Sequence, residues 1–274
     1  MKQPFAAFGL ICFCFLRGIA PAQSPAPALR GPRYLALGDS VTFGYNPTVA
    51  VNLNNYHGYP EFVSAALQRG VANASCPGET TESFFIATAP DNGCHAWKLF
   101  GGPLFVPYSG TQLDYALSFL RNNPKPDLVT INLGANDLFL VLEHCGLDLN
   151  CDQSGLPAMF AAYGRSLFTI FASIRLQARY EGPMVLLTYY VANYHEPVEV
   201  TLFTELNGIA SGIASAFGVK IADGFNAFQL ATIPFAGDAC AAGLLVRLPS
   251  GGCDVHPSLA GQKLLAEAVL LVAR

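Results

Sequence analysis

The chain has 274 residues, of which 52% are hydrophobic and only 12% are charged. A chain of this length and composition can bury a large core, which argues against wholesale disorder and suits one large α/β domain or two smaller ones. The formal net charge of −4 and the lack of any Lys/Arg cluster argue against a nucleic-acid partner.

The N-terminus has the pattern of a secretory signal peptide. Lys2 supplies a positive charge, residues 5–16 form a short apolar core, and residues 20–22 (Ala-Pro-Ala) offer a cleavage site. A membrane anchor is the alternative, but Arg17 interrupts the apolar stretch, which is shorter than the ~20 residues that span a bilayer. The sequence therefore predicts a secreted or periplasmic protein with a signal peptide at 1–22, a Pro/Ala-rich leader at 23–32 and a folded domain at 33–274.

Six of the eight cysteines follow the predicted cleavage site, and an even number in an exported protein favours disulfides. We prefer pairs that are local in the sequence, because each pair brackets one loop that contains Gly, Pro or Asp. A zinc site is the alternative, but the sequence has no C-x-x-C pair. The predicted disulfides are Cys76–Cys94, Cys145–Cys151 and Cys240–Cys253.

Apolar runs of strand length alternate along the chain with segments whose apolar residues recur at helical spacing. The expected strands are residues 34–37, 71–74, 128–133, 184–189 and 219–222, and the expected helices are residues 60–68, 111–122, 156–180, 198–217 and 258–272. Such alternation is typical of a parallel sheet that is covered on both faces. The sequence therefore predicts an α/β fold: a three-layer α/β/α sandwich with a central parallel, flavodoxin-like sheet.

The segment 84–108 is rich in aromatic residues but too irregular for one helix, because glycines and prolines interrupt it. Two interpretations stay open. The segment is either an apolar loop packed on the core, or a wall or lid over an apolar substrate site.

Three of the expected strands end in a polar cluster, and a fourth polar cluster precedes the last helix. These clusters are residues 38–40, 75–81, 134–137 and 253–257. Parallel strands end at one rim, where open α/β sheets bind their ligands. Ser40 is therefore a candidate nucleophile. His256, the only histidine in one of these clusters, is a candidate base that can exchange a proton at neutral pH.

Together the four clusters resemble the blocks of the SGNH, or GDSL-type, hydrolase superfamily of esterases and lipases. That family is named for a Ser in Gly-Asp-Ser, a Gly, an Asn in Gly-x-Asn-Asp and a His near the C-terminus, which match Ser40, Gly78, Asn136 and His256. The resemblance implies that Ser40 attacks the ester and His256 takes its proton. It also implies an oxyanion hole made of the backbone N–H groups of Ser40 and Gly78 and the side-chain amide of Asn136. Loss of one such donor typically costs about 3 kcal/mol of barrier.

One position departs from the family pattern, which usually has an Asp three residues before the His. Here that position is Cys253, and Asp254 lies only two residues before His256. Two interpretations stay open: Asp254 orients His256 and completes a triad, or a backbone carbonyl near Cys253 does so and leaves a dyad.

Structural roles are the alternative for several of these residues. Ser40 or Asp39 could cap the helix after the first strand, and Asn136 could be a turn residue, which is the role we expect for Asp137. Gly78 also belongs to an ordinary Pro-Gly turn pair. No H-E-x-x-H motif is present, so we expect solvated side chains and no metal site from the other histidines: His57, His95, His144 and His195.

The sequence thus predicts a serine hydrolase that cleaves carboxylic esters of lipid or acyl type through an acyl-enzyme, without a cofactor. A carbohydrate O-acetylesterase and a non-catalytic surface-binding module on the same scaffold are the alternatives. We expect a monomer that takes a small-molecule or lipid ester and makes transient contact with a lipid interface. The residues expected to bind the substrate are Phe43, Tyr45, Phe85, Trp97 and Phe139.

Overall fold

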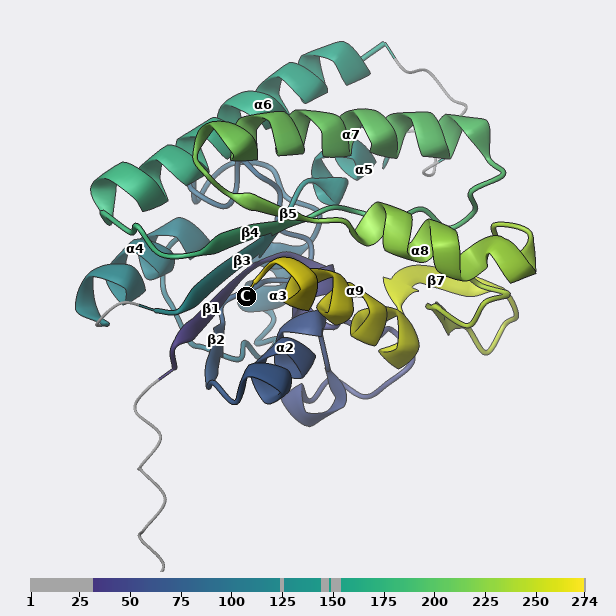
Figure 1. The fold of residues 1–274 in the computed structure, drawn as a ribbon, viewed down its shortest axis with the longest axis horizontal. Coiled ribbons are helices and arrows are strands. Elements are labelled where there is room, and N and C mark those ends of the chain that lie inside the picture. Colours follow the sequence, from purple (N-terminus) through teal and green to yellow (C-terminus); the bar gives the residue numbers. More distant parts are fainter. Residues whose placement is uncertain (1–31, 124–125, 144–147, 149–153, 274) are drawn as a thin grey trace, which may run out of the picture.

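A five-stranded parallel sheet forms the centre of the molecule (Figure 1). The computed structural model describes residues 32–123, 126–143, 148 and 154–273, and the strands follow the order β2-β1-β3-β4-β5. All neighbouring strands in it run parallel. This order is flavodoxin-like, so the predicted fold class is confirmed. The strands are β1 (Tyr34–Gly38), β2 (Val71–Asn73), β3 (Leu128–Asn132), β4 (Met184–Leu187) and β5 (Lys220–Ala222).

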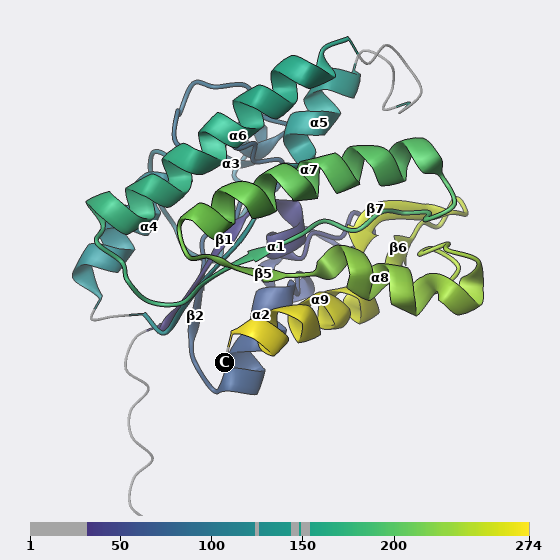
Figure 2. The ribbon, with the colours of Figure 1, turned by 45° about the horizontal axis from the view of Figure 1, so that its top comes forward.

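Helices cover both faces of the sheet and make the three-layer sandwich (Figures 1 and 2). One face carries α4 (Gln112–Asn122), α5 (Ala135–Leu142), α6 (Leu156–Ala172) and α7 (Pro197–Ala216). The other face carries α2 (Tyr59–Leu67), α8 (Gly224–Thr232) and α9 (Leu259–Val272). Because both faces are covered, every residue of β1, β3 and β4 is buried. This burial accounts for the continuous apolar runs of the sequence.

The helix predicted over residues 156–180 ends earlier than its sequence pattern indicates. After Ala172 the chain forms a π-helical turn, Ser173–Gln177. Arg175 in this turn donates hydrogen bonds to the carbonyls of Tyr180 (2.8 Å) and Gly182 (2.8 Å). These bonds tie the end of the helix to the start of β4, so the chain turns there rather than continuing as a helix.

A small antiparallel hairpin was not predicted and proves important for the site. It consists of β6 (Leu245–Arg247) and β7 (Cys253–Pro257). The turn between them contains Gly251 (φ 93°) and Gly252 (φ 72°), whose backbone conformation favours glycine. The strands, of three and five residues, are too short to show a clear periodicity in the sequence.

Two of the three predicted disulfides are present: Cys76–Cys94 and Cys240–Cys253. The first joins the loop after β2 to the start of α3 (Cys94–Leu99), and the second joins the loop after α8 to β7. Because these four sulfurs are paired, they offer no thiolate to a zinc ion. The predicted pair Cys145–Cys151 lies outside the described residues.

The aromatic segment 84–108 divides between the core and the surface. Phe84 is fully buried in the core, and the rings of Trp97 and Phe105 contact Phe43 at centroid distances of 5.8 and 5.0 Å. Phe100 at the end of α3, by contrast, is 84% exposed. The interpretation as an apolar loop packed on the core therefore holds for part of this segment, and a wall or lid over a substrate site stays a prediction.

Residues 1–31, with the predicted signal peptide and most of the leader, lie outside the described residues. Of the helices in the described ranges, none is long and apolar enough to cross a membrane.

Glu61 in α2 is a largely buried carboxyl, and burial raises its pKa to about 7. Its oxygens accept hydrogen bonds from Gly58 N (2.9 Å) and Asn73 Nδ2 (3.1 Å). The folded protein holds this proton more tightly than the unfolded chain, where the pKa is 4.5. The free energy of unfolding should therefore fall as the pH rises from about 4.5 to about 7, by on the order of 3 kcal/mol from this group.

We expect Glu61→Gln to remove most of the fall in the free energy of unfolding that Glu61 causes as the pH rises. Urea unfolding of the wild type and the variant between pH 5 and pH 8 measures this free energy. Glu205→Gln, an exposed change on α7, is the matched control and should keep the wild-type slope. If the free energy of unfolding changes with pH equally in Glu61→Gln and the wild type, Glu61 does not titrate in this range.

Candidate active site

The strand order places the predicted catalytic blocks side by side. β1 lies between β2 and β3, and the three parallel strands end at the same rim. Ser40 follows β1, Gly78 follows β2, and Asn136 follows β3 in the first turn of α5. The three residues line one common cavity.

Ser40 begins the short helix α1 (Ser40–Phe43), and Asp39 is the residue that caps it. The Asp39 Oδ1 atom accepts from Val41 N at 2.9 Å, so the cap does not use the Ser40 hydroxyl. Gly38 before it has φ 148°, and a Cβ there would lie 2.3 Å from the Asn132 carbonyl oxygen. Only glycine fits this close approach, which brings Ser40 to the rim of the sheet. In the described part of the chain, neither the backbone N–H of Ser40 nor its hydroxyl has a hydrogen-bond partner.

Gln112 fixes the backbone immediately before this turn. Its Oε1 accepts from Gly38 N at 2.6 Å, and its Nε2 donates to Gly38 O at 3.0 Å and to Glu79 Oε2 at 3.1 Å. Gln112 and Glu79 are both buried, and burial raises the pKa of Glu79. The sequence did not single out either residue, because no motif marks them and only folding brings them together.

Glu79 also lies beside Cys76 and Cys94, and its carboxylate and their sulfurs all fall within 4.8 Å of one another. Cys76 and Cys94 form a disulfide, and a disulfide sulfur is not the thiolate that binds a metal. This cluster therefore does not have the ligands of a metal centre.

Gly78 occupies a turn that requires glycine. Its φ is 84°, and a Cβ would lie 2.3 Å from the Asn92 carbonyl oxygen. The Gly78 carbonyl accepts from Asn92 N at 2.8 Å. Its N–H group has no acceptor among the described residues, and Gly78 lines the cavity that Ser40 lines. This is the position that an oxyanion donor needs.

Asn136 and Asp39 belong to one buried network at the rim. Asn136 Nδ2 donates to Asp39 Oδ2 (3.3 Å) and to the Glu79 carbonyl (3.0 Å). Tyr189, which follows β4, donates its hydroxyl to Asp39 Oδ2. Burial raises the pKa of Asp39 to about 6. Both oxygens of Asp137, the residue next to Asn136, accept from Thr81, which is a structural role as expected.

His256 lies on β7, and the group at its Nδ1 is the Asp254 carboxylate. Residues two apart in a strand point to the same side, so a D-x-H spacing in an extended segment brings the two side chains together. Asp254 Oδ1 also accepts from His256 N at 3.0 Å. Burial alone would raise the pKa of Asp254, but the hydrogen bonds and charge of His256 outweigh it, and the pKa lies below its usual value.

Several contacts hold β7 against the sheet. The Tyr190 hydroxyl donates to the Val255 carbonyl at 2.7 Å, and the Tyr45 ring meets the His256 ring edge-on at a centroid distance of 5.0 Å. Within the described residues no hydrogen bond joins Ser40 to His256, although both line the same cavities. Catalytic hydrogen bonds are often long in free enzymes and tighten when substrate binds.

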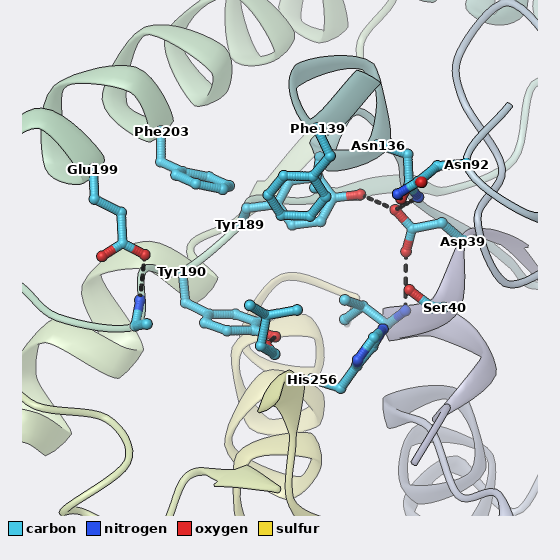
Figure 3. Close-up of a pocket in the computed structure, with 14 residues that line it drawn as sticks. Asp39, Ser40, Asn92, Asn136, Phe139, Tyr189, Tyr190, Glu199, Phe203 and His256 are labelled. Atoms are coloured by element: carbon cyan, nitrogen blue, oxygen red, sulfur yellow. Dashed lines mark hydrogen bonds between the residues drawn. The ribbon is translucent and has the colours of Figure 1, made fainter. Parts of the chain in front are cut away.

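Two cavities meet at these residues. The larger has a volume of about 320 Å³ and its wall is mostly apolar. Figure 3 draws Ser40 and His256 at one end of it and Phe203 and Glu199 at the other. The smaller has a volume of about 220 Å³. Beyond the residues that they share, the larger is lined by Asp39, Val41, Ala135, Phe139, Tyr189, Tyr190, Ala192, Glu199, Phe203 and Val255, and the smaller by Tyr45, Pro77, Gly78, Gly93 and Trp97.

The predicted substrate-binding residues separate into three groups. Phe139 lines the larger cavity, and Tyr45 and Trp97 line the smaller. Phe43 is fully buried, and Phe85 packs against the core, so neither lines these two cavities. The sequence missed Tyr189 and Tyr190, although Tyr189 ends a predicted strand at the same rim and Tyr190 follows it, so the rule for strand ends could have found both.

Comparison with known proteins agrees with the geometry. Residues 36–264 match the model of the GDSL-like Lipase/Acylhydrolase family. An acetylxylan esterase from Geobacillus stearothermophilus has a similar fold, with a TM-score of 0.52 and 18% identity over 89% of this chain and 94% of that chain. An α/β hydrolase enzyme from the metagenome of Lake Arreo, Spain, gives a TM-score of 0.54 and 19% identity over 89% and 95% of the two chains. No curated protein matches the sequence.

At these identities the solved structures show a shared fold and no more. The family match is more specific, because residues 36–264 contain all four blocks together with the hairpin that carries His256. The chain therefore belongs to the GDSL-like lipase/acylhydrolase family and is a carboxylic ester hydrolase.

Proposed function

We propose that the protein is a secreted serine hydrolase that cleaves esters of apolar carboxylic acids through an acyl-enzyme on Ser40. The observation that carries this proposal is the larger cavity, whose mostly apolar wall begins at Ser40 and His256 and extends to Phe203. A mostly apolar wall favours an acyl chain over a polar group, because burying apolar surface is favourable and burying an unpaired polar group is costly.

In the proposed reaction Ser40 Oγ attacks the ester carbonyl carbon while His256 Nε2 takes the hydroxyl proton. The carbonyl oxygen becomes an anion, which the free N–H groups of Ser40 and Gly78 stabilise together with a side-chain amide that the family pattern assigns to Asn136. His256 returns the proton to the leaving alcohol as the C–O bond breaks. A water molecule then attacks the acyl-enzyme, with His256 again as base, and releases the acid and Ser40.

In this scheme Asp254 is the residue that orients His256. Its carboxylate holds the ring through Nδ1 and leaves Nε2 for Ser40. It also stabilises the imidazolium that forms when the proton moves. The lowered pKa of Asp254 supports this role, because the carboxylate stays ionised next to the ring at neutral pH.

Hydrolysis of p-nitrophenyl acetate, octanoate and palmitate tests the acyl preference. We expect the highest kcat/KM on octanoate or palmitate. Activity confined to acetate would overturn the proposal and favour a carbohydrate O-acetylesterase. The smaller cavity supports that second candidate, because Tyr45 and Trp97 offer aromatic rings next to Ser40. The esterase from Geobacillus stearothermophilus with a similar fold is described as acting on acetylxylan.

Ala192 gives a more local test of the larger cavity. It lines the cavity wall, and its backbone bonds to Glu199 and Ala239 do not depend on its side chain. We expect Ala192→Phe to fill the cavity and lower kcat/KM on octanoate by roughly tenfold or more, with little change on acetate.

The matched control for this change is Ala65→Phe, an exposed site on α2 outside both cavities, which should leave both substrates unchanged. An equal loss on acetate and octanoate in Ala192→Phe would mean that the acyl chain does not occupy the larger cavity.

The two disulfides indicate an oxidising compartment, and we infer export through the signal peptide predicted at 1–22. We also infer a monomer that makes transient contact with a lipid interface. Leu99 (79% exposed) and Phe100 (84% exposed) support such contact. They lie at the end of α3, shortly after Trp97, which lines the smaller cavity, so an apolar surface adjoins the site.

A further inference from the structure

The far end of the larger cavity differs from its apolar middle. Figure 3 draws Ser40 and His256 at one end of the cavity and the Glu199 carboxylate, with the Phe203 ring, at the other. The proposed reaction uses only the end at Ser40. A carboxylate at the end of an apolar cavity is unexpected for a site that binds a plain hydrocarbon chain, because a charge is costly to bury beside apolar groups.

Aromatic rings form much of the wall that leads to this carboxylate. Four aromatic side chains line the cavity: Phe139, Tyr189, Tyr190 and Phe203. The hydroxyls of Tyr189 and Tyr190 donate to a carboxylate and to a backbone carbonyl of the protein. These two residues therefore offer ring surface to a substrate rather than a hydrogen-bond donor. The face of an aromatic ring attracts a cation as well as apolar groups.

Glu199 lies in the first turn of α7 and holds the loop that follows β4. Its Oε1 accepts from Ala192 N at 2.7 Å, and its Oε2 accepts from Asn193 N at 3.2 Å. A carboxylate oxygen has two lone pairs, so each oxygen can still accept another hydrogen bond. Among the residues that the structure describes, no lysine, arginine or histidine forms an ion pair with Glu199. Its charge is therefore not neutralised by a cation of the described chain.

The charge of the whole cavity has the same sign. The lining holds two carboxyl groups, Asp39 and Glu199, and His256, and the described residues that form it include no lysine or arginine. Asp39 is only 1% exposed and already accepts from Val41 N and Tyr189. Burial raises the pKa of Glu199, and its two backbone N–H partners oppose this by favouring the ionised form. A cation bound in the cavity would favour that form further, whereas an anion would be repelled.

We propose that the larger cavity takes an acyl chain that carries a cationic group, such as a quaternary ammonium, at the end away from the ester carbonyl. Glu199 supplies the opposite charge and Phe203 supplies a ring face. The apolar middle of the chain contacts the wall between them and Ser40. The inference rests on the proposed hydrolysis by Ser40 with the acyl chain in this cavity, and it names the class of acid that the enzyme releases.

Two p-nitrophenyl esters of equal shape test the proposal: 8-(trimethylammonio)octanoate and its neutral isostere 9,9-dimethyldecanoate. They differ only in the positively charged nitrogen that replaces one carbon, so chain length and steric fit are the same. We expect kcat/KM of the wild type to be roughly tenfold higher on the cationic ester. A purely apolar cavity would favour the neutral ester instead. An equal or lower kcat/KM on the cationic ester would overturn the proposal.

Glu199→Gln removes the charge and keeps the size of the side chain. We expect the ratio of kcat/KM on the cationic ester to kcat/KM on the neutral ester to fall roughly tenfold. Any disturbance of the loop that Glu199 holds affects both esters and cancels in this ratio. Glu196→Gln, the same change at an exposed acid outside both cavities, is the matched control and should keep the wild-type ratio. An unchanged ratio in Glu199→Gln would overturn the proposal.

Phe203→Leu gives a second test if Glu199→Gln fails to fold in urea titrations. Leucine keeps an apolar side chain but has no ring face for a cation. The same ratio should therefore fall by roughly threefold or more. If the ratio stays at the wild-type value, the ring does not contact a cation and the proposal is wrong.

The neutral ester distinguishes failure of this inference from failure of the proposed function. If the wild type hydrolyses neither ester and takes up no fluorophosphonate, the proposed hydrolysis is wrong and this inference fails with it. If the wild type hydrolyses the neutral ester well and the cationic ester poorly, the proposed hydrolysis stands and only the cation site at Glu199 is wrong.

Discussion

Ser40→Ala should abolish ester hydrolysis, with kcat on p-nitrophenyl octanoate falling by roughly 10⁶-fold. Without the hydroxyl no acyl-enzyme can form, and the remaining groups can only assist direct attack by water. The substitution removes one atom that has no hydrogen-bond partner among the described residues, so stability should change little. Initial rates and thermal unfolding of the same preparation measure both effects.

Covalent labelling gives a second readout of the same change. A fluorophosphonate should add one mass increment to the wild type and none to Ser40→Ala. Ser215→Ala, an exposed serine on α7, is the matched control and should label and turn over as the wild type. Labelling that persists in Ser40→Ala, or turnover within tenfold of the wild type, would place the nucleophile elsewhere.

Asp254→Asn should produce the next largest loss, a fall in kcat of roughly 10³- to 10⁴-fold. The amide cannot stabilise the imidazolium, and its NH₂ group favours the ring tautomer that places the proton on Nε2, the atom that must accept the proton of Ser40. KM should change little, because Asp254 lines neither cavity. The rate of fluorophosphonate labelling should fall with kcat, since both depend on activation of Ser40.

The control for Asp254→Asn is Asp223→Asn. Asp223 caps α8 through Asn226 N at 2.9 Å, and asparagine caps helices equally well, so this variant should keep full activity. A loss of only a fewfold in Asp254→Asn and in Asp254→Ala would remove Asp254 from the triad and leave a Ser40–His256 dyad.

The sequence predicted the sheet well because burial on both faces leaves a strong local signal. The run from Tyr34 to Leu37 is apolar throughout, and every residue of it is buried in β1. Because parallel strands end at one rim, the sequence alone also places Ser40, Gly78 and Asn136 together. The disulfides Cys76–Cys94 and Cys240–Cys253 followed from the short loops that they close.

The sequence predicted less where residues meet only through folding. Gln112 contacts Gly38 across 74 positions, and Asn92 contacts Asn136 across 44, so no local pattern marks either residue. The spacing of Asp254 and His256 looked irregular against the family pattern. It becomes regular once β7 is known to be extended, because a strand repeats every two residues.

Each described disulfide ends next to a catalytic block. Cys76 lies two residues before Gly78, and Cys253 is adjacent to Asp254. A loop that is free to move loses conformational entropy whenever it must adopt one geometry. Here that entropy is lost once, when the cysteines pair during oxidative folding, and not again in each catalytic cycle. The crosslinks thus pre-organise the oxyanion turn and the acid–base strand, so the binding energy of the ester is not used to order them.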